Sequence, residues 1–341
     1  MKNDGKSTSS SKSIGLEYLR VICMLLVIVN HLVADLSASP YTSELFRHFW
    51  RINTPMISFG MPMFFFISGI LLMRQFRSGK FHDTTFCEFF RKKFVRLMIP
   101  YIVFTGLTML WYRFFDIRAI VELNFWHLWF LPTLMWCTSL LFLYLDNVKL
   151  SGIKGLAANL SLLTICMTLP FMGFPKYLAL DSMAYWIFTF VCGVLFERYR
   201  STKTSLSGWS VATVLSAAIY IVVWMFIPWE YRGEPTLAYM LSLVVLMSSV
   251  CGLFESIRIN TATIANQIIL FIAAFSFSIY NIHYLVIGIT VRRPVLKILN
   301  IIHVNDTTPA VLIMVQCALV VSVSLGLCWM YQYCHRKIRN L

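Results

Sequence analysis

Apolar segments long enough to cross a membrane recur along the whole chain, and they limit the folds available to it. Only 13% of the 341 residues are charged, whereas 58% are hydrophobic; soluble domains have about twice that charge fraction. In lipid, every backbone polar group must be paired within a helix or a closed barrel, and a helix needs about 20 apolar residues to span the hydrocarbon core. The sequence therefore predicts an all-α integral membrane protein with about ten transmembrane helices.

The apolar runs define the expected spans and the domain organisation. The predicted spans are 15–36, 56–73, 94–114, 128–146, 152–170, 182–198, 209–227, 236–254, 265–290 and 309–333. We expect a short basic cytoplasmic tail over residues 1–13, one multi-span domain over 14–333 and a second basic cytoplasmic tail over 334–341. No small-residue cleavage site follows the first apolar segment, so we expect this segment to be retained as a span.

The distribution of lysine and arginine predicts the orientation. With a cytoplasmic N-terminus, 19 of the 29 basic residues fall in inner segments and nine in outer segments, with Arg20 inside the first span. Basic residues favour the cytoplasmic side, so both termini are predicted to be cytoplasmic in a cell (inner) membrane. This bias accounts for the formal charge of +14 without a nucleic-acid partner. The nine cysteines are scattered without metal-ligand spacing, so no metal site is predicted.

The first span contains two ionisable side chains, Arg20 and His31. Eleven residues of helix are about three turns, so both lie on nearly the same face, roughly 16 Å apart along the axis. A buried ionisable pair in a span is costly and indicates a functional site. The alternative is that Arg20 extends to the cytoplasmic interface while His31 caps the other end.

Two more histidines, His127 and His283, are predicted at a depth similar to that of His31. Histidine transfers protons near neutral pH, so three histidines at one level favour acid–base chemistry. Each one alone is also compatible with an ordinary interfacial role. Trp129, beside His127, equally fits an aromatic belt.

On the opposite side, Lys93 and Arg96 share one helix face and, with Arg20, suit a phosphorylated cytosolic ligand. Positive-inside anchoring explains the same charges. Ser68 and Gly69 interrupt the aromatic second span, where small residues permit either close helix packing or the passage of a ligand chain.

The ordered set of motifs resembles the membrane-bound acyltransferase family 3. Glu17 to Arg20 is similar to its acidic-x-x-Arg opening, and Arg20 to His31 reproduces its Arg-x10-His signature. MPMFFFISGILLM resembles its second span, and Lys93-x-x-Arg96 resembles the start of its third, where the family often has arginine in place of Lys93. WHLWFL and SIYNIHYLV, which includes Tyr280, resemble its later signatures, particularly those of the stand-alone branch resembling the enterobacterial common antigen O-acetyltransferase.

The resemblance implies a membrane O-acetyltransferase that takes an acetyl group from cytosolic acetyl-CoA, a co-substrate and not a permanently bound cofactor. The implied acceptor is a hydroxyl of a cell-surface polysaccharide or of its lipid-linked precursor. His31 is then the catalytic base or the acyl carrier. The implied donor-binding residues are Arg20, Lys93, Arg96, Ser68 and Gly69. The possible acceptor-binding or supporting residues are Glu17, Asp35, His127, Trp129, Tyr280 and His283.

Two alternatives stay open from the sequence. The same fold could use succinyl-CoA or another short acyl-CoA. A membrane transporter of a glycan or glycolipid belongs to a different class, and two related halves with broken helices would favour it. No such halves are evident in the sequence. The oligomeric state is not predicted.

Overall fold

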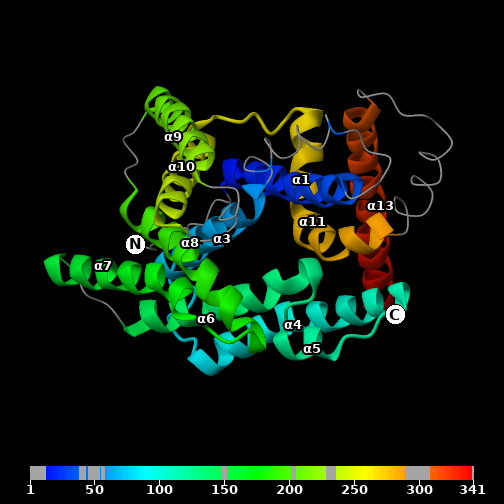
Figure 1. Ribbon diagram of the computed structural model, residues 1–341, viewed down its shortest axis with the longest axis horizontal. Coiled ribbons are helices and arrows are strands. Elements are labelled where there is room, and N and C mark those ends of the chain that lie inside the picture. The colour runs from blue at the N-terminus through cyan, green and yellow to red at the C-terminus, as the bar shows by residue number, and fades with distance from the viewer. Residues whose placement is uncertain are drawn as a thin grey trace, which may run out of the picture.

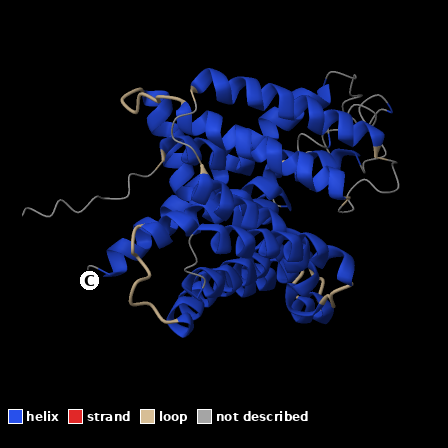
Figure 2. Ribbon diagram, turned by 90° about the vertical axis from the view of Figure 1, so that its left-hand side faces the viewer, coloured by secondary structure: helices blue, strands red, loops and turns tan. Residues whose placement is uncertain are grey.

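The computed structural model describes residues 13–37, 44, 54, 58–147, 152–200, 205–227, 236–288 and 308–339. All regular structure in these ranges is helical, without strands (Figure 2). The α-helices are α1 Ile14–Ser37, α3 Gly60–Arg77, α4 Phe86–Tyr112, α5 Ile117–Glu122, α6 Phe130–Asn147, α7 Gly152–Thr168, α8 Leu180–Tyr199, α9 Leu206–Phe226, α10 Leu237–Ser256, α11 Ile264–Ile287 and α13 Thr308–Arg339. Three 3₁₀ turns, η1 Trp126–Trp129, η2 Leu169–Met172 and η3 Tyr177–Ala179, join some of them.

Each of the ten predicted spans contains a helix. Across the described ranges, nine spans are long and apolar enough to cross a membrane. The remaining predicted span, 56–73, corresponds to α3, which is 18 residues long and carries Arg74 and Arg77 in its last turn. The prediction of an all-α protein with about ten transmembrane helices is therefore confirmed. The orientation of the termini stays a prediction.

Helix α4 begins eight residues before the predicted third span, because its start is set by a cap and not by hydropathy. The Thr85 hydroxyl accepts a hydrogen bond from the backbone N–H of Glu88 at 3.3 Å. A threonine followed three residues later by glutamate is a sequence typical of helix N-termini. Hydroxyl caps also open three other helices, at Ser205, Thr236 and Thr263.

Helix α1 occupies the centre of the helix bundle (Figure 1). In this view α9, α10, α11 and α13 lie around it in the upper half, while α4 to α7 form the lower half. One set of its side chains, including Leu19 and Val27, belongs to the main apolar core. Another set, Met24, Ile28 and Leu32, recurs every four residues and packs in a second core with residues of α11 and α13. Burial on both sides explains why this helix is apolar on most of its circumference.

Helices α1 and α11 run parallel and touch at three levels. The Tyr18 hydroxyl donates a hydrogen bond to the Asn266 side chain near the start of both helices. Two residues after Tyr18, Arg20 reaches Ser276, which is ten residues after Asn266 on α11. Towards their ends, the rings of His31 and His283 lie 5.3 Å apart between centroids. The two polar residues of α1 thus face one partner helix.

Helices α3 and α8 approach each other closely at two glycines. A Cβ atom on Gly69 would lie 2.2 Å from the Phe190 carbonyl oxygen, and one on Gly193 would lie 2.0 Å from that of Phe66. No side chain fits at such separations, so both positions require glycine. The small residue in the second span therefore serves the close helix packing that the sequence offered as one of two explanations.

An ion-pair network joins the ends of α3, α8 and α10. Arg74 contacts Glu197 at 3.0 Å and Glu255 at 2.5 Å, and Arg200 pairs with Glu255. Both carboxylates are less than a tenth exposed. Partly buried arginines thus neutralise two buried acids at this end of the helix bundle.

Candidate active site

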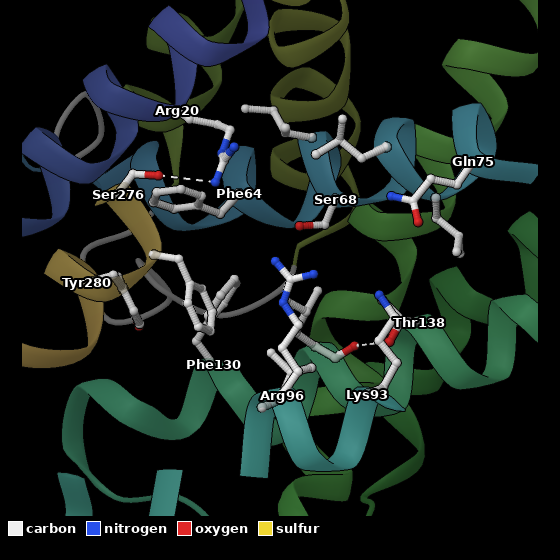
Figure 3. Close-up of a pocket in the computed structure, with 16 residues that line it drawn as sticks. Arg20, Phe64, Ser68, Gln75, Lys93, Arg96, Phe130, Thr138, Ser276 and Tyr280 are labelled. Atoms are coloured by element: carbon white, nitrogen blue, oxygen red, sulfur yellow. Dashed lines mark hydrogen bonds between the residues drawn. The ribbon is translucent and has the colours of Figure 1, made fainter. Parts of the chain in front are cut away.

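A polar cavity of about 180 Å³ lies among five helices (Figure 3). Helices α1, α3, α4, α6 and α11 each contribute to its wall. Of the predicted site residues, the structure brings five together here: Arg20, Ser68, Lys93, Arg96 and Tyr280. The remaining wall residues are Phe64, Ile67, Leu71, Leu72, Gln75, Leu97, Phe130, Leu134, Thr138, Ser276 and Phe277.

Arg20 points into this cavity and not along the lipid face. Its Nη1 contacts a Glu17 carboxylate oxygen at 2.9 Å, one turn earlier on α1. Its Nη2 donates a hydrogen bond to the Ser276 hydroxyl of α11 at 3.1 Å. The guanidinium is thereby held between two helices and keeps donors available on its cavity side. Glu17, predicted as a supporting residue, orients Arg20 in this way.

Two more cations come from the first half of α4. Lys93 and Arg96 are three residues apart, so one helix face presents both to the cavity. The Lys93 ammonium lies 5.2 Å from the Phe89 ring centroid, and the Arg96 guanidinium lies 6.0 Å from that of Phe277. None of the described residues that line the cavity is acidic. The cavity is therefore electropositive and suits an anionic ligand.

The second part of the site is a cluster of three histidines. The ring centroids of His31 and His127 are 6.3 Å apart, and those of His127 and His283 are 5.0 Å apart. Tyr284 completes the cluster, stacking on His127 at 4.9 Å and meeting His31 edge-on at 5.3 Å. His127 and His283 are 2% and 0% exposed, whereas His31 is partly exposed, so two of the three rings are shielded from solvent. Residues about 100 and 150 positions apart in sequence thus meet, as their shared depth predicted.

The hydrogen bonds of His127 and His283 define their tautomers when the rings are neutral. His283 Nδ1 lies 2.6 Å from the Tyr280 carbonyl oxygen, and His127 Nε2 lies 3.3 Å from that of Asn281. A carbonyl oxygen only accepts, so each of these nitrogens carries the proton. The opposite nitrogens, His283 Nε2 and His127 Nδ1, have no hydrogen-bond partner among the described residues. Each therefore offers a free lone pair to a hydroxyl group.

Tyr280 connects the two parts of the site. Its ring lines the cavity, and its hydroxyl donates a hydrogen bond to the His127 backbone carbonyl. The Tyr280 and His283 ring centroids are 5.5 Å apart. Because His127 also bonds to the Asn281 carbonyl, two hydrogen bonds fix η1 against α11. The cation-lined cavity and the histidine cluster are thus neighbours on opposite sides of one tyrosine.

Three of the predicted site residues lie elsewhere or are not described. Gly69 packs against α8 and does not line the cavity. Trp129 stacks on Phe65 and on Trp186, which also stack on each other. The side chain of Asp35 lies outside the described residues.

Three polar residues of the cavity wall and one ring of the histidine cluster were not predicted from the sequence. Gln75, Thr138 and Ser276 line the cavity, and Tyr284 packs in the histidine cluster. Ser276 and Tyr284 belong to the segment FSFSIYNIHY, where each lies four residues from Tyr280, so helical spacing carried a signal for them. Nothing in the local sequence distinguishes Gln75 or Thr138 from other polar residues in a span.

Comparison with known proteins gives one match. A family model described as an acyltransferase domain, that of acyltransferase family 3, matches residues 13–329 and so covers both parts of the site. None of the curated proteins and none of the solved structures matches the chain.

Proposed function

This chain belongs to the acyltransferase family 3 and is a membrane acyltransferase; on that premise we propose that it moves an acetyl group from cytosolic acetyl-CoA to a glycan. The acceptor is a hydroxyl of a cell-surface polysaccharide or of its lipid-linked precursor, as in the stand-alone branch that the sequence resembles. The protein lies in the inner membrane with both termini in the cytoplasm. The cationic cavity then opens from the donor side and the histidines face the acceptor side.

The cavity suits the acyl-bearing arm of the donor. Its volume of about 180 Å³ is below the ~300–1,000 Å³ of pockets that enclose a whole drug-sized ligand. We therefore place the pantetheine arm in it, beside Ser68, with the nucleotide outside. Lys93, Arg96 and Arg20 would bind phosphate oxygens by charge-assisted hydrogen bonds. Gly69 contributes indirectly, because its contact with α8 determines how deeply α3 carries Ser68 into the wall.

His31 carries the proton transfer in this proposal. Its neutral ring takes the proton of the acceptor hydroxyl while the oxygen attacks the thioester carbonyl. The carbon–sulfur bond then breaks, and the departing CoA thiolate receives the proton from His31. In a second route, His31 attacks the thioester first, the CoA thiolate leaves, and His31 holds the acetyl group until the acceptor oxygen takes it, while the proton of the hydroxyl passes to the thiolate. His127 Nδ1 and His283 Nε2, each with a free lone pair, orient the hydroxyl.

One observation carries the proposal most directly: Tyr280 lines the cation-rich cavity and also contacts two of the three histidines. A donor arm that enters the cavity therefore ends beside a group able to move protons. A cavity with cations alone would fit transport of an anion, but it would leave the histidine cluster without a role. Because the cation-rich cavity and the histidine cluster meet at Tyr280, acyl transfer is favoured over the transporter alternative.

Isotopically labelled acetyl-CoA supplied to the cytoplasmic face of membrane vesicles tests the proposal. We expect labelled acetyl groups, released by mild base, in the glycan fraction of vesicles that contain the protein and not in those that lack it. Succinyl-CoA in parallel tests the alternative donor. Movement of unmodified glycan across the vesicle membrane, without label in it, would instead establish the transporter.

A further inference from the structure

We propose that Phe64, Phe130 and Tyr280 form an aromatic gate between the cavity and the histidine cluster. The Phe64 side chain is the one that moves to admit a short acyl group. This inference rests on the proposed acyl transfer. It assigns to the three rings the selection of acyl length and the sealing of the site.

The rings contact one another in a closed triangle. The centroid of Phe64 lies 6.0 Å from that of Phe130 and 6.1 Å from that of Tyr280, and the last two are 5.2 Å apart. All three rings line the cavity, whereas none of the three histidines does. Figure 3 shows the triangle at one end of the cavity and Gln75, Lys93 and Thr138 at the other. The open space thus stops at these rings.

The histidines begin immediately behind the triangle. The Tyr280 centroid lies 5.5 Å from that of His283 and 6.3 Å from that of His127. Phe130 follows His127 by three residues, at the start of α6. A thioester in the cavity can therefore reach His31 only after the rings separate. A closed triangle also blocks water between the two sides of the membrane, which protects the thioester from hydrolysis.

The three rings differ in how firmly they are held. Tyr280 is 3% exposed and its hydroxyl is bonded to the His127 carbonyl. Phe130 is 4% exposed and packs edge-on against Phe65 at 4.9 Å. Phe64 is only partly buried and carries no polar anchor. Rotation of Phe64 towards the cavity is therefore the least costly way to open the triangle, and the gap it leaves limits the acyl group.

Substitution of Phe64 tests the gate. Phe64→Ala enlarges the gap, so we expect the rate of butyryl transfer relative to acetyl transfer to rise roughly tenfold or more, the discrimination that surplus methylenes meet in a tight pocket. Phe64→Trp narrows the gap and should lower acetyl transfer while donor binding stays unchanged. Leu71→Ala is the matched control, since Leu71 lines the same cavity two turns further along α3. It should leave the butyryl-to-acetyl ratio at the wild-type value.

Proton leak through proteoliposomes gives a second measurement that does not depend on acyl transfer. Phe64→Ala should leak protons faster than the wild type and Leu71→Ala. If the wild type transfers no acyl group but Phe64→Ala leaks protons, the proposed acyl transfer is refuted, whereas the role of the three rings as a barrier to protons is supported. If Phe64→Ala and Phe64→Trp reach the membrane in wild-type amounts and change neither the acyl ratio nor the leak, the gate is wrong.

Discussion

The cavity and the histidine cluster lie on either side of Tyr280, yet they differ in almost every physical property. The cavity has three cations, polar walls and open volume. The cluster consists of aromatic rings, and two of its histidines, His127 and His283, are nearly fully buried. The three cations of the cavity are carried on long side chains, whereas His127 and His283 are fixed by hydrogen bonds to backbone carbonyls.

This difference indicates a division of labour between binding and chemistry. Flexible cations can follow a diphosphate as it arrives, and electrostatic attraction acts over several ångströms. Proton transfer requires atoms within hydrogen-bond reach, which rigid rings supply. Substitutions of the cavity cations should therefore change mainly the KM for the donor, and substitutions of the histidines should change mainly kcat.

The largest expected effect is at His31. His31→Ala should lower kcat by ~10²–10⁴-fold, since a general base or acyl carrier is lost. Acyl transfer to glycan and acyl-CoA binding, both measured on the purified protein in lipid discs, check this. Donor binding should be unchanged, which keeps the two regions distinct. Wild-type transfer by His31→Ala would remove His31 from the reaction.

The next effect concerns the cavity cations. Arg96→Ala should weaken donor binding roughly 10- to 100-fold, because a charge-assisted hydrogen bond contributes about 1.5–3 kcal/mol and 1.4 kcal/mol is tenfold. Equilibrium binding of a non-hydrolysable acetyl-CoA analogue measures it. Arg91→Ala is the control: the same charge leaves the same helix, but Arg91 does not line the cavity. If both variants lose the same donor affinity, these basic residues determine the orientation in the membrane and do not form a specific donor site.

A third prediction concerns α3, which supplies Ser68 and other residues to the cavity wall. Gly69→Ala should destabilise the protein by about 1–3 kcal/mol, the usual range for overpacking, because the new Cβ meets the α8 backbone. Thermal unfolding in detergent measures it. Gly106→Ala, where a Cβ meets nothing within 4 Å, should leave the melting temperature nearly unchanged. A stable Gly69→Ala with weakened donor binding would instead place the donor chain against this glycine.

The smallest expected effect is at His283. His283→Asn keeps a donor near the position of Nδ1 for the Tyr280 carbonyl but removes the free Nε2 lone pair. One neutral hydrogen bond contributes about 0.5–1.5 kcal/mol, so kcat should fall roughly 2- to 13-fold at an unchanged donor KM. Steady-state kinetics separates the two constants. A change confined to donor KM would contradict the division between the two regions.

Helical periodicity was sufficient to predict much of this site. It placed Arg20 and His31 on one face of α1, and Lys93 and Arg96 on one face of α4. Hydropathy located the ten helices to within a few residues, apart from two boundaries. The start of α4 depends on the cap at Thr85, and α13 continues six residues beyond the predicted end at 333. These are properties of one helix at a time.

Contacts between helices were beyond the reach of the sequence. Trp129 and His127 are two residues apart, yet one stacks on Trp186 and the other joins the histidines. Gly69 and Ser68 are adjacent, yet one faces α8 and the other the cavity. The direction in which each points depends on which helices become neighbours, and local periodicity does not specify the neighbours.

The ion pairs at the end of α3 have a consequence for the biosynthesis of this protein. Arg74 finds its carboxylate partners 123 and 181 residues later in the chain. Helix α3 leaves the ribosome before α8 and α10 do, so Arg74 lacks both carboxylate partners until those helices are made. Its final position in the bilayer depends on the arrival of α8 and α10. A chain truncated before Glu255 therefore lacks one of the two carboxylates that pair with Arg74 of α3.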